Sequence, residues 1–406
     1  MATSKKQGNT YSVTAGLDIG NGYTKGRVDV GGTVYPVDIP SAMAYTSAAR
    51  LAQPVSEESL SDLANSLDAT VLSPAIPSVD RGRVLFGKRA ITSKWDEIQF
   101  QIDSPVPKSR ESLSVMLILD AIVSQVIAVA GFKGTLPTDI EVDAKLALAL
   151  PIDDYLGHHT EYRESLMREP HRVIVHNFGT DVEVKTTFSD VVVVAEGVAA
   201  LAALKNRGED FLDKVVSFER ASGATFDAAY TGEALAAAQN IVGIDIGEGT
   251  TNFAVFTNGT IDTDNSKSIN RGFGTILDEV LDLLRQTDSG IPADSRGALE
   301  KILLSEPTLP KQQRIKARVE KELQKVIPTF VNRVTKTFSN VWRSVGAQVE
   351  VVYIYGGGAS FVRDALVPRI SQATESDGME TPVICLDSSY SRVLNADGLF
   401  RAAENL

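Results

Sequence analysis

The phrase Asp-Ile-Gly-x-Gly occurs twice in this chain, and each copy carries residue types that suit phosphate chemistry. The first copy is AGLDIGNGYTKG, residues 15–26, and the second is VGIDIGEGTTNF, residues 242–253. Glycines let a backbone turn come close to a ligand, and successive N–H groups in such a turn can surround an anion. A carboxylate at the end of the preceding strand, Asp18 or Asp245, can hold a hydrated Mg²⁺ that neutralises the anion.

Two such turns facing each other across a cleft would hold a polyphosphate from both sides. A single Gly-rich hairpin turn is common, but two copies with an Asp at each strand end are hard to explain by packing alone. Lys25 follows the first turn and can reach a phosphate as a point charge. The candidate phosphate-binding residues are Gly20, Asn21, Gly22, Tyr23, Thr24 and Lys25 in the first copy, and Gly247, Glu248, Gly249, Thr250 and Thr251 in the second.

Length, charge and cysteine content limit the class of protein. With 406 residues the chain is long enough for two or more domains. A net charge of −12 disfavours direct, non-specific DNA binding. The single cysteine, Cys385, fits a reducing compartment, so we expect a cytoplasmic protein, and the opening residues 1–10 do not resemble a secretory signal. The apolar stretch 113–130 contains Asp120, and we interpret it as a buried helix rather than a membrane span.

The elements around the two phrases repeat as well. Strands are predicted at 11–20, 23–30 and 33–40, with the first phrase as the turn between the first two strands and Gly31-Gly32 as a tight hairpin turn. From Ile241 the same order returns: strand, glycine turn, strand, hairpin, strand. Both halves therefore follow a βββαβα-like plan, which predicts two α/β domains with a cleft between them.

The remaining segments give provisional domain boundaries. Segments 181–188 and 190–197 are predicted as separate strands, and 311–345 as a highly charged helix broken at Pro328. The predicted organisation is domain I at 1–206 with an inserted, loop-rich subdomain at 41–100 and a closing helix at 388–406, an insertion of uncertain role at 207–240, and domain II at 241–387 with an inserted subdomain at 271–349.

Taken together, the motifs resemble those of the actin, heat-shock-chaperone and sugar-kinase superfamily. LDIGNGYTKG is similar to its first phosphate loop, IDIGEGTTNF to its second, and VVYIYGGGASFVRDAL, with Gly356, Gly357 and Gly358, to its adenosine motif. VVVVAEGVAALAAL and RVLNADGLF resemble the two interdomain connectors. The details look most like the plasmid-segregation actins of the ParM/StbA type. The resemblance implies the actin-like ATPase fold, with two duplicated, ribonuclease-H-like α/β domains around a nucleotide cleft.

The resemblance also implies roles for individual residues. Asp18 and Asp245 would order Mg²⁺ and its waters, and Glu196 would orient the water that attacks the γ-phosphate of ATP or GTP. Glu196 also fits a purely structural role as an acid at a helix N-terminus. Thr250 and Thr251 are either phosphate donors or ordinary strand residues.

The function implied is a filament-forming, Mg-dependent ATPase that segregates plasmid DNA through a small adaptor protein bound to a centromere-like site. The partners would be other copies of the chain and this adaptor, without direct membrane or DNA binding. A sugar or other small-molecule kinase on the same fold remains an alternative, as does a bacterial cytoskeletal actin with no part in segregation.

Three other features carry less weight. The four histidines, His158, His159, His171 and His176, match no metal-binding spacing. Cys385 is best explained as a buried strand residue. The charged helix at 311–326 is most simply a solvated face, or a surface that meets a neighbouring copy in a polymer.

Overall fold

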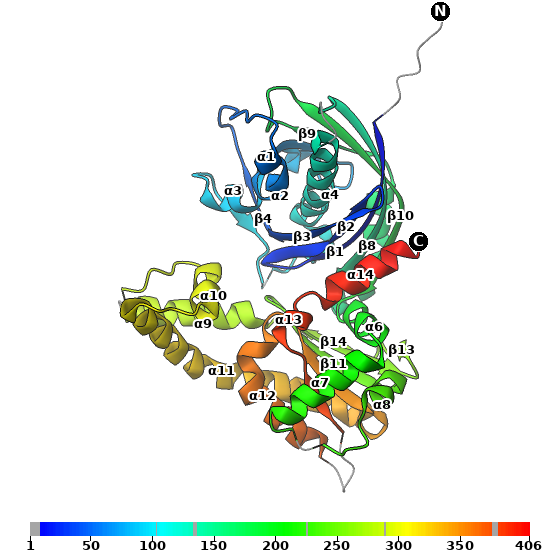
Figure 1. The fold of residues 1–406 in the computed structure, drawn as a ribbon, viewed down its shortest axis with the longest axis vertical. Helices are drawn as coiled ribbons and strands as arrows, with labels where there is room; N and C mark the ends of the chain where they lie inside the picture. Colours follow the sequence, from blue (N-terminus) through cyan, green and yellow to red (C-terminus); the bar gives the residue numbers. More distant parts are fainter. Residues whose placement is uncertain (1–8, 103, 133–135, 225, 288–289, 376–380) are drawn as a thin grey trace, which may run out of the picture. The chain divides into compact units, whose positions relative to one another are not determined.

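The structure is a computed structural model that describes residues 9–102, 104–132, 136–224, 226–287, 290–375 and 381–406. They form two compact units: unit 1 is Met1–Ala203 with Val393–Leu406, and unit 2 is Leu204–Arg392 (Figure 1). The segment 207–240 belongs to unit 2. Residues 1–8, part of the stretch where the sequence predicts no secretory signal, lie outside the described residues.

Unit 1 is built on one ten-stranded sheet with the order β3-β2-β1-β8-β10-β9-β5-β6-β4-β7. β1 pairs antiparallel with β2 and parallel with β8, which in turn pairs parallel with β10. The strands are β1 (Thr10–Ile19), β2 (Tyr23–Val30), β3 (Thr33–Pro40), β4 (Ala42–Tyr45), β5 (Asp68–Leu72), β6 (Gly82–Phe86), β7 (Ile98–Gln99), β8 (Asp139–Leu150), β9 (His171–Val175) and β10 (Val182–Ala195).

The hairpin between β2 and β3 turns at Gly31 and Gly32, as the sequence predicts. Their φ angles of 63° and 93° lie in the left-handed region, where only glycine is free of a steric penalty. The two strands predicted at 181–188 and 190–197 form one strand instead. β10 runs on through a register shift between Phe188 and Asp190, because a β-bulge absorbs the extra residue without ending the strand.

The long apolar helix α4 (Ser112–Phe132) forms the centre of unit 1, and the sheet curves around it (Figure 1). By length and composition it could cross a membrane, but 94% of its most apolar 18-residue window is buried inside the protein. Asp120 lies within this core and accepts a hydrogen bond from the hydroxyl of Ser124 at 3.0 Å. Burial raises the pKa of Asp120 well above its usual value.

The segment 41–100 extends the unit 1 sheet, whereas the sequence predicts loops. Strands β4 to β7 continue this sheet because β5 pairs with β9. Short helices accompany these strands: α1 (Glu57–Ser61), α2 (Leu63–Ser66) and α3 (Gly87–Thr92), with 3₁₀ turns η1 (Ser78–Asp80) and η2 (Lys108–Arg110). The remaining helices of unit 1 are α5 (Ile152–Met167), α6 (Val198–Asn206), which runs on into unit 2, and α14 (Leu394–Glu404).

Unit 2 repeats the strand–turn–strand opening on a smaller sheet with the order β13-β12-β11-β15-β16, and β14 pairs with β12. The strands are β11 (Ile241–Ile246), β12 (Thr251–Thr257), β13 (Thr260–Ile261), β14 (Lys267–Ile269), β15 (Val351–Tyr355) and β16 (Val383–Cys385). The helices are α7 (Glu209–Ala221), α8 (Gly232–Ala237), α9 (Phe273–Gln286), α10 (Arg296–Leu304), α11 (Pro310–Val345), α12 (Ala359–Thr374) and α13 (Ser388–Ser391), with η3 (Gly346–Gln348).

Helix α11 continues through Pro328 for 36 residues, so the predicted break at this proline is wrong. Proline removes one backbone hydrogen bond and normally kinks or ends a helix. Here the apolar side chains on either side, including Ile327 and Phe330, are buried in the same core cluster of unit 2. Burial of the side chains on both sides of Pro328 offsets the loss of this backbone hydrogen bond.

The segment 207–240 supplies α7 and α8, and a buried ion pair attaches α7 to α12. Glu219 has only 1% of its side chain exposed and lies 2.9 Å from the guanidinium of Arg363. Arg363 also donates to the carbonyl of Cys385 at 2.9 Å. Cys385 itself is buried in the core, and burial raises its thiol pKa to about 12.

The closing helix α14 lies against β1 and α6 in unit 1, at distances that only glycine allows. A Cβ at Gly16 would come within 2.1 Å of the backbone nitrogen of Phe400, and one at Gly398 within 2.0 Å of the carbonyl of Ala199. Arg27 and Asp397 add an ion pair of 2.7 Å. The helix thereby covers the strand that leads into the first phosphate phrase.

Candidate active site and its two half-sites

The first predicted phosphate loop is a tight turn between β1 and β2 in unit 1. The N–H of Gly20 donates to the carbonyl of Tyr23 at 3.1 Å. Ser41 supports the turn from outside, because its hydroxyl donates to the carbonyl of Gly20 at 2.7 Å and its N–H to the carbonyl of Gly22 at 2.9 Å. Thr24 is buried, and its hydroxyl lies 3.0 Å from that of Ser41. Its side chain therefore supports the loop from within the protein.

Parallel pairing brings the two predicted catalytic acids of unit 1 to the same edge of the sheet. Asp18 lies at the carboxyl end of β1, and Glu196 follows directly after the last residue of β10, with β8 between the two strands. The N–H of Glu196 donates to the carbonyl of Leu150 at the end of β8, at 2.7 Å. Ligands of open α/β sheets bind at this carboxyl edge.

Lys108 joins this group, although nothing in its sequence context marks it. Its ammonium nitrogen donates to the carbonyl of Ile19 at 2.9 Å and lies 3.5 Å from a carboxylate oxygen of Glu196. Both side chains of this ion pair are largely buried, with 11% and 10% exposed. Lys108 belongs to a short 3₁₀ turn outside the repeated pattern, so only the tertiary fold brings it to the first phosphate loop.

The electrostatics of this half-site favour a bound cation. Burial, and next the negative charge of Glu196, raise the pKa of Asp18 to about 6, while Lys25 and Lys108 oppose the rise. Lys25 is the cross-strand partner of Asp18 in the β1–β2 hairpin. Two neighbouring carboxylates fit a hydrated Mg²⁺, which usually takes one or two carboxylates and completes its shell with waters and phosphate oxygens.

The second predicted phosphate loop has the same hydrogen bond as the first. The N–H of Gly247 donates to the carbonyl of Thr250 at 2.9 Å, as Gly20 does to Tyr23. The start of α9 holds the loop, since the N–H groups of Phe273 and Gly274 donate to the carbonyls of Gly247 and Glu248 at 2.9 and 2.8 Å. The repeated sequence motif therefore forms the same backbone turn in both units.

The side chains around the second loop differ from those around the first. Asp245 is 5% exposed at the end of β11. Thr251 is buried, and its hydroxyl donates to the carbonyl of Arg271 at 2.6 Å. This hydroxyl proton therefore already forms a hydrogen bond within unit 2. The hydroxyl of Thr250 accepts from the amide of Asn252 at 3.3 Å.

Glu248 is the acid of the second loop, and an arginine anchors it. Arg296, at the start of α10, lies 3.7 Å from Glu248 and forms two short hydrogen bonds to Asp278. Neither Arg296 nor Asp278 was among the residues that the sequence predicts for the site. Their segment is not repeated in the first half, so the comparison of the two copies could not reveal them.

The glycines of the adenosine motif lie directly against the second loop. Gly356 has a φ of 98°, and a Cβ there would be 2.4 Å from both a carboxylate oxygen of Asp245 and the carbonyl of Ile246. The N–H of Gly358 donates to that same carbonyl at 3.0 Å. A Cβ at Gly357 would meet no atom within 4 Å. The middle glycine therefore presents open backbone beside the strand end that carries Asp245.

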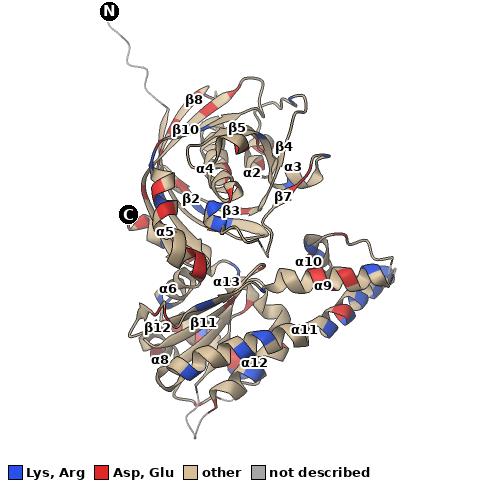
Figure 2. Cartoon of the chain, turned by 180° about the vertical axis from the view of Figure 1, so that it is seen from behind, with Lys and Arg blue, Asp and Glu red and all other residues tan. Residues whose placement is uncertain are grey.

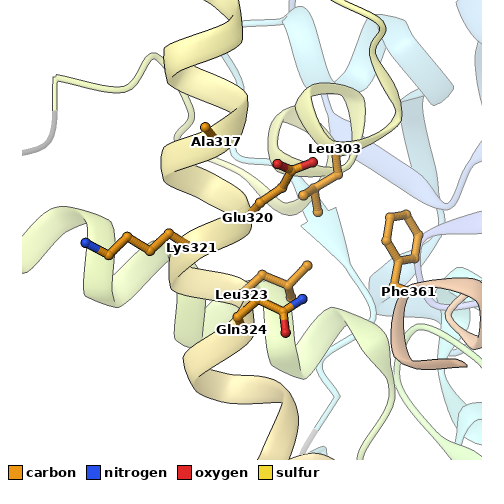
Figure 3. Close-up of a pocket in the computed structure, with 7 residues that line it drawn as sticks. All are labelled: Leu303, Ala317, Glu320, Lys321, Leu323, Gln324 and Phe361. Carbon is orange, nitrogen blue, oxygen red and sulfur yellow. The ribbon is translucent and has the colours of Figure 1, made fainter. Parts of the chain in front are cut away.

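A pocket of about 450 Å³ lies between α10, α11 and the start of α12 (Figure 3). Phe361 lines it, follows Gly358 by three residues, and stacks on Phe273 at 4.2 Å between ring centroids. Since Phe273 also donates to the second loop, the aromatic pair connects that loop to the pocket. The lining residues are Leu303, Ala317, Glu320, Lys321, Leu323, Gln324 and Phe361.

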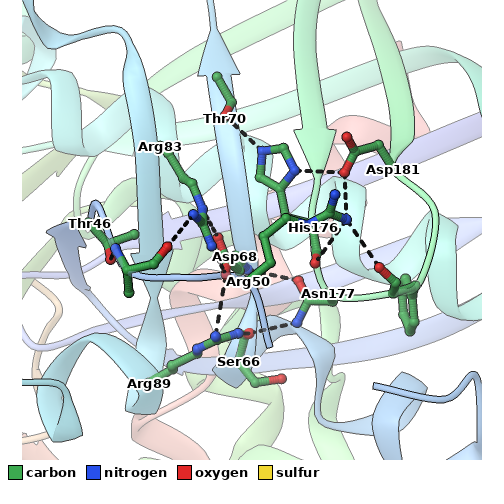
Figure 4. A network of polar contacts seen from close by, with 12 residues as sticks. Thr46, Arg50, Ser66, Asp68, Thr70, Arg83, Arg89, His176, Asn177 and Asp181 are labelled. Carbon is green, nitrogen blue, oxygen red and sulfur yellow. Dashed lines mark hydrogen bonds and ion pairs between the residues drawn. The ribbon is translucent and has the colours of Figure 1, made fainter. Parts of the chain in front are cut away.

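The histidines have structural surroundings. His171 is buried, and its ring nitrogens lie 2.7 Å from the hydroxyl of Ser73 and 2.8 Å from the carbonyl of Leu166. His176 lies between Thr70 and Asp181, each at 2.8 Å (Figure 4). The same figure shows Asp68, which binds two arginines, Arg83 and Arg89. His158 and His159 lie on α5.

The comparisons with known proteins match both halves of the chain. Residues 16–198 match the family model of the N-terminal domain of actin-like proteins, and residues 243–368 match that of the C-terminal part of archaeal MreB-like actin homologues. Neither family model covers residues 199–242, which include α7 and α8. No curated protein sequence matches the chain.

Solved structures match over nearly the whole length. The archaeal actin homologue Ta0583 superimposes with a TM-score of 0.61 at 16% identity, covering 98% of this chain and 100% of its own. Bacillus thuringiensis ParM with ATP gives 0.60 at 16% identity, covering 97% and 99%. A 15-stranded ParM filament from Clostridium botulinum gives 0.61 at 15% identity, covering 98% and 100%.

The predicted fold class is thereby confirmed: the chain has the actin-like fold, with a mixed α/β sheet in each unit. Both halves match actin-like family models in the order in which the motifs occur along the sequence. The chain therefore has an actin-like fold, and models of actin-like families match residues 16–198 and 243–368.

Proposed function

We propose that this protein binds and hydrolyses a nucleoside triphosphate with Mg²⁺, and that both phosphate loops contact the same nucleotide. The observation that carries the proposal is the repeated turn, in which Gly20 and Gly247 make the same backbone hydrogen bond beside an Asp at a strand end. A repeated glycine turn next to a carboxylate serves a phosphate and its metal ion. ParM proteins with ATP and with ADP, which share this fold, support it.

Each part of the half-sites has a role in this proposal. Asp18 and Asp245 hold the waters of Mg²⁺, and Lys25 neutralises phosphate charge. Glu196 orients the attacking water, because hydrolysis of a γ-phosphate depends mainly on alignment and charge neutralisation. Lys108 positions Glu196 and the end of β1. The pocket between α10, α11 and α12 takes the nucleobase, with Phe361 as its aromatic wall.

We further propose that the protein forms filaments in its nucleoside-triphosphate state and that these filaments segregate plasmid DNA in the cytoplasm through a small DNA-binding adaptor. The structural likeness to a ParM filament from Clostridium botulinum supports filament formation. Segregation is the finer part of the proposal and rests on the resemblance of the connector and closing-helix sequences to those of plasmid-segregation actins.

Light scattering with purified protein tests the proposal. We expect scattering to rise on addition of Mg-ATP or Mg-GTP and to fall as phosphate is released. Glu196→Gln should leave nucleotide binding intact and slow hydrolysis by about 10²- to 10⁴-fold. Phosphate release at an unchanged rate in this variant would remove Glu196 from the mechanism. Nucleotide turnover only in the presence of a sugar or another small acceptor would favour a kinase.

A further inference from the structure

Helix α11 has a charge opposite to that of the protein that carries it. It contains nine Lys or Arg residues and two Glu residues, which gives it a net charge of +7 in a chain with a net charge of −12. The remainder of the chain thus carries −19. Figure 2 shows the cations as blue bands along α11.

These cations share one side of the helix. At 100° per residue, eight of the nine fall within an arc of about 120°, opposite the part of the buried face that includes Ile327, Val334 and Phe338. The stripe extends about 48 Å along the axis, and its first five members span about 21 Å. We call this set the basic stripe; its members are Lys311, Arg314, Arg318, Lys321, Lys325, Arg333, Lys336 and Arg343.

The charge of the stripe is little compensated within the protein. Glu322 is the acid within the arc, and 3% of its side chain is exposed. It forms ion pairs with Arg318 at 3.7 Å and with Lys325 at 2.6 Å. The second acid of the helix, Glu320, pairs with Lys316, which lies outside the stripe. Neither glutamate of α11 therefore places an exposed carboxylate among the cations of the stripe.

The stripe also lacks the apolar groups that protein and membrane contacts use. None of the exposed large hydrophobic side chains of the described residues lies on α11. Protein interfaces draw most of their binding energy from buried aromatic and other apolar anchors and are depleted in lysine. Amphipathic membrane helices need a hydrophobic face that enters the lipid. A phosphodiester backbone needs neither, since its affinity comes from the release of counterions by cations.

From this we propose that the basic stripe of α11 binds the phosphate backbone of double-stranded DNA without reading its sequence. The negative net charge of the whole chain does not exclude such binding at one positively charged surface. At physiological salt the Debye length is about 8 Å, so acids elsewhere on the protein are largely screened from a ligand on the solvent face of the helix. The inference goes beyond the proposed function and does not depend on nucleotide hydrolysis.

Fluorescence anisotropy with a labelled 30-base-pair duplex of arbitrary sequence tests it, in the absence of nucleotide and across a series of KCl concentrations. We expect wild-type protein to bind with a salt slope of about −4, corresponding to four or five contacted phosphates. The test variant carries Lys311→Glu, Arg314→Glu and Lys336→Glu, three exposed residues outside the nucleobase pocket. It should bind at least 10-fold more weakly, with a slope shallower by about 3.

A matched control makes the same change in charge elsewhere. Lys88→Glu, Lys145→Glu and Lys185→Glu are exposed positions on α3, β8 and β10 of unit 1. This variant should bind the duplex within about twofold of wild type at 0.15 M salt, where distant charges are screened. Thermal unfolding of both variants shows whether they are folded.

Three results would overturn the proposal: no binding by wild type at 50 mM KCl, equal weakening in both triple variants, or a stripe variant that binds like wild type. If that last variant no longer scatters light with Mg-ATP, the stripe contacts a second copy instead. If it no longer sediments with vesicles of anionic lipid, the stripe is a membrane surface. Because DNA binding is measured without nucleotide, failure here leaves the proposed hydrolysis untouched, and absence of hydrolysis leaves this test valid.

Discussion

The ammonium nitrogen of Lys108 lies 3.5 Å from a carboxylate oxygen of Glu196. The same nitrogen donates to the carbonyl of Ile19, next to Asp18. One side chain therefore connects the end of β1 to the residue that follows β10. Under the proposed function, Lys108 is a positioning residue that keeps Glu196 aligned.

Lys108→Met removes this charge and retains most of the aliphatic stem. We expect phosphate release to slow by about tenfold or more, because Glu196 loses the contact that aligns it. Nucleotide affinity should change less than turnover. Lys94→Met, which changes an exposed lysine of unit 1, is the control. Turnover that stays at the wild-type level in Lys108→Met would show that the ion pair has no part in hydrolysis.

The raised pKa of Asp18 predicts a specific dependence of stability on pH in the protein without nucleotide. The folded pKa is about 6, against an ordinary value of 3.8. Between these values the folded state holds a proton that the unfolded chain has released, so the free energy of unfolding falls as pH rises from about 4 to about 6. At pH 7 this loss reaches at most about 3 kcal/mol.

Asp18→Asn removes the titrating group and therefore the loss. Urea unfolding at pH 4.5 and pH 7 should show that the variant gains more stability relative to wild type at the higher pH. Glu141→Gln, at an exposed position on β8, is the control. A difference between Asp18→Asn and wild type that is the same at both pH values would contradict the assignment.

Phe361 is predicted to contribute to nucleotide affinity through the pocket that it lines. Aromatic stacking contributes about 0.5–1.5 kcal/mol beyond burial, so Phe361→Leu should weaken binding several-fold. A fluorescent nucleotide titration measures this. Phe132→Leu, which changes a phenylalanine that is 51% exposed in unit 1, should leave affinity unchanged. If Phe361→Leu binds nucleotide as tightly as wild type, the base lies elsewhere.

Gly398→Ala is predicted to destabilise unit 1. Its Cβ would come within 2.0 Å of the carbonyl of Ala199, so α14 must move away from α6. Overpacking of this kind costs about 1–3 kcal/mol. Gly157→Ala is the matched control, because Gly157 lies within α5 with no atom within 4 Å of the added methyl. It should raise stability by up to about 1 kcal/mol, since alanine favours helix. Equal unfolding midpoints for the two variants would contradict the contact.

The sequence could predict the parts of the site that are local. Gly20 and Gly247 each stand in a short phrase that repeats, and a turn between two strands is determined by its own residues. Lys108 and Arg296 could not be found this way. Each lies in a segment without a counterpart in the other half, and each reaches its loop only through packing of distant elements.

The same distinction explains the errors in the fold. Pro328 predicts a helix break from local geometry, yet the burial of side chains on both sides keeps α11 continuous. The loop-rich reading of 41–100 came from short, weakly patterned strands. Those strands are stable because β5 pairs with β9, a partner about one hundred residues further along the chain. Pairing of this kind leaves no periodic signal in the segment itself.

The place of α14 has a consequence for how the protein is made. Leu399 and Ala403 of this helix complete an apolar cluster with Ala147, Ala149 and Ala199 of unit 1. Residues 393–406 leave the ribosome only after every residue of unit 2, although they belong to the unit whose synthesis begins first. Domains generally fold as units during translation, and the earlier one usually finishes first. Here all of unit 2 can be synthesised and folded before α14 is available to cover β1.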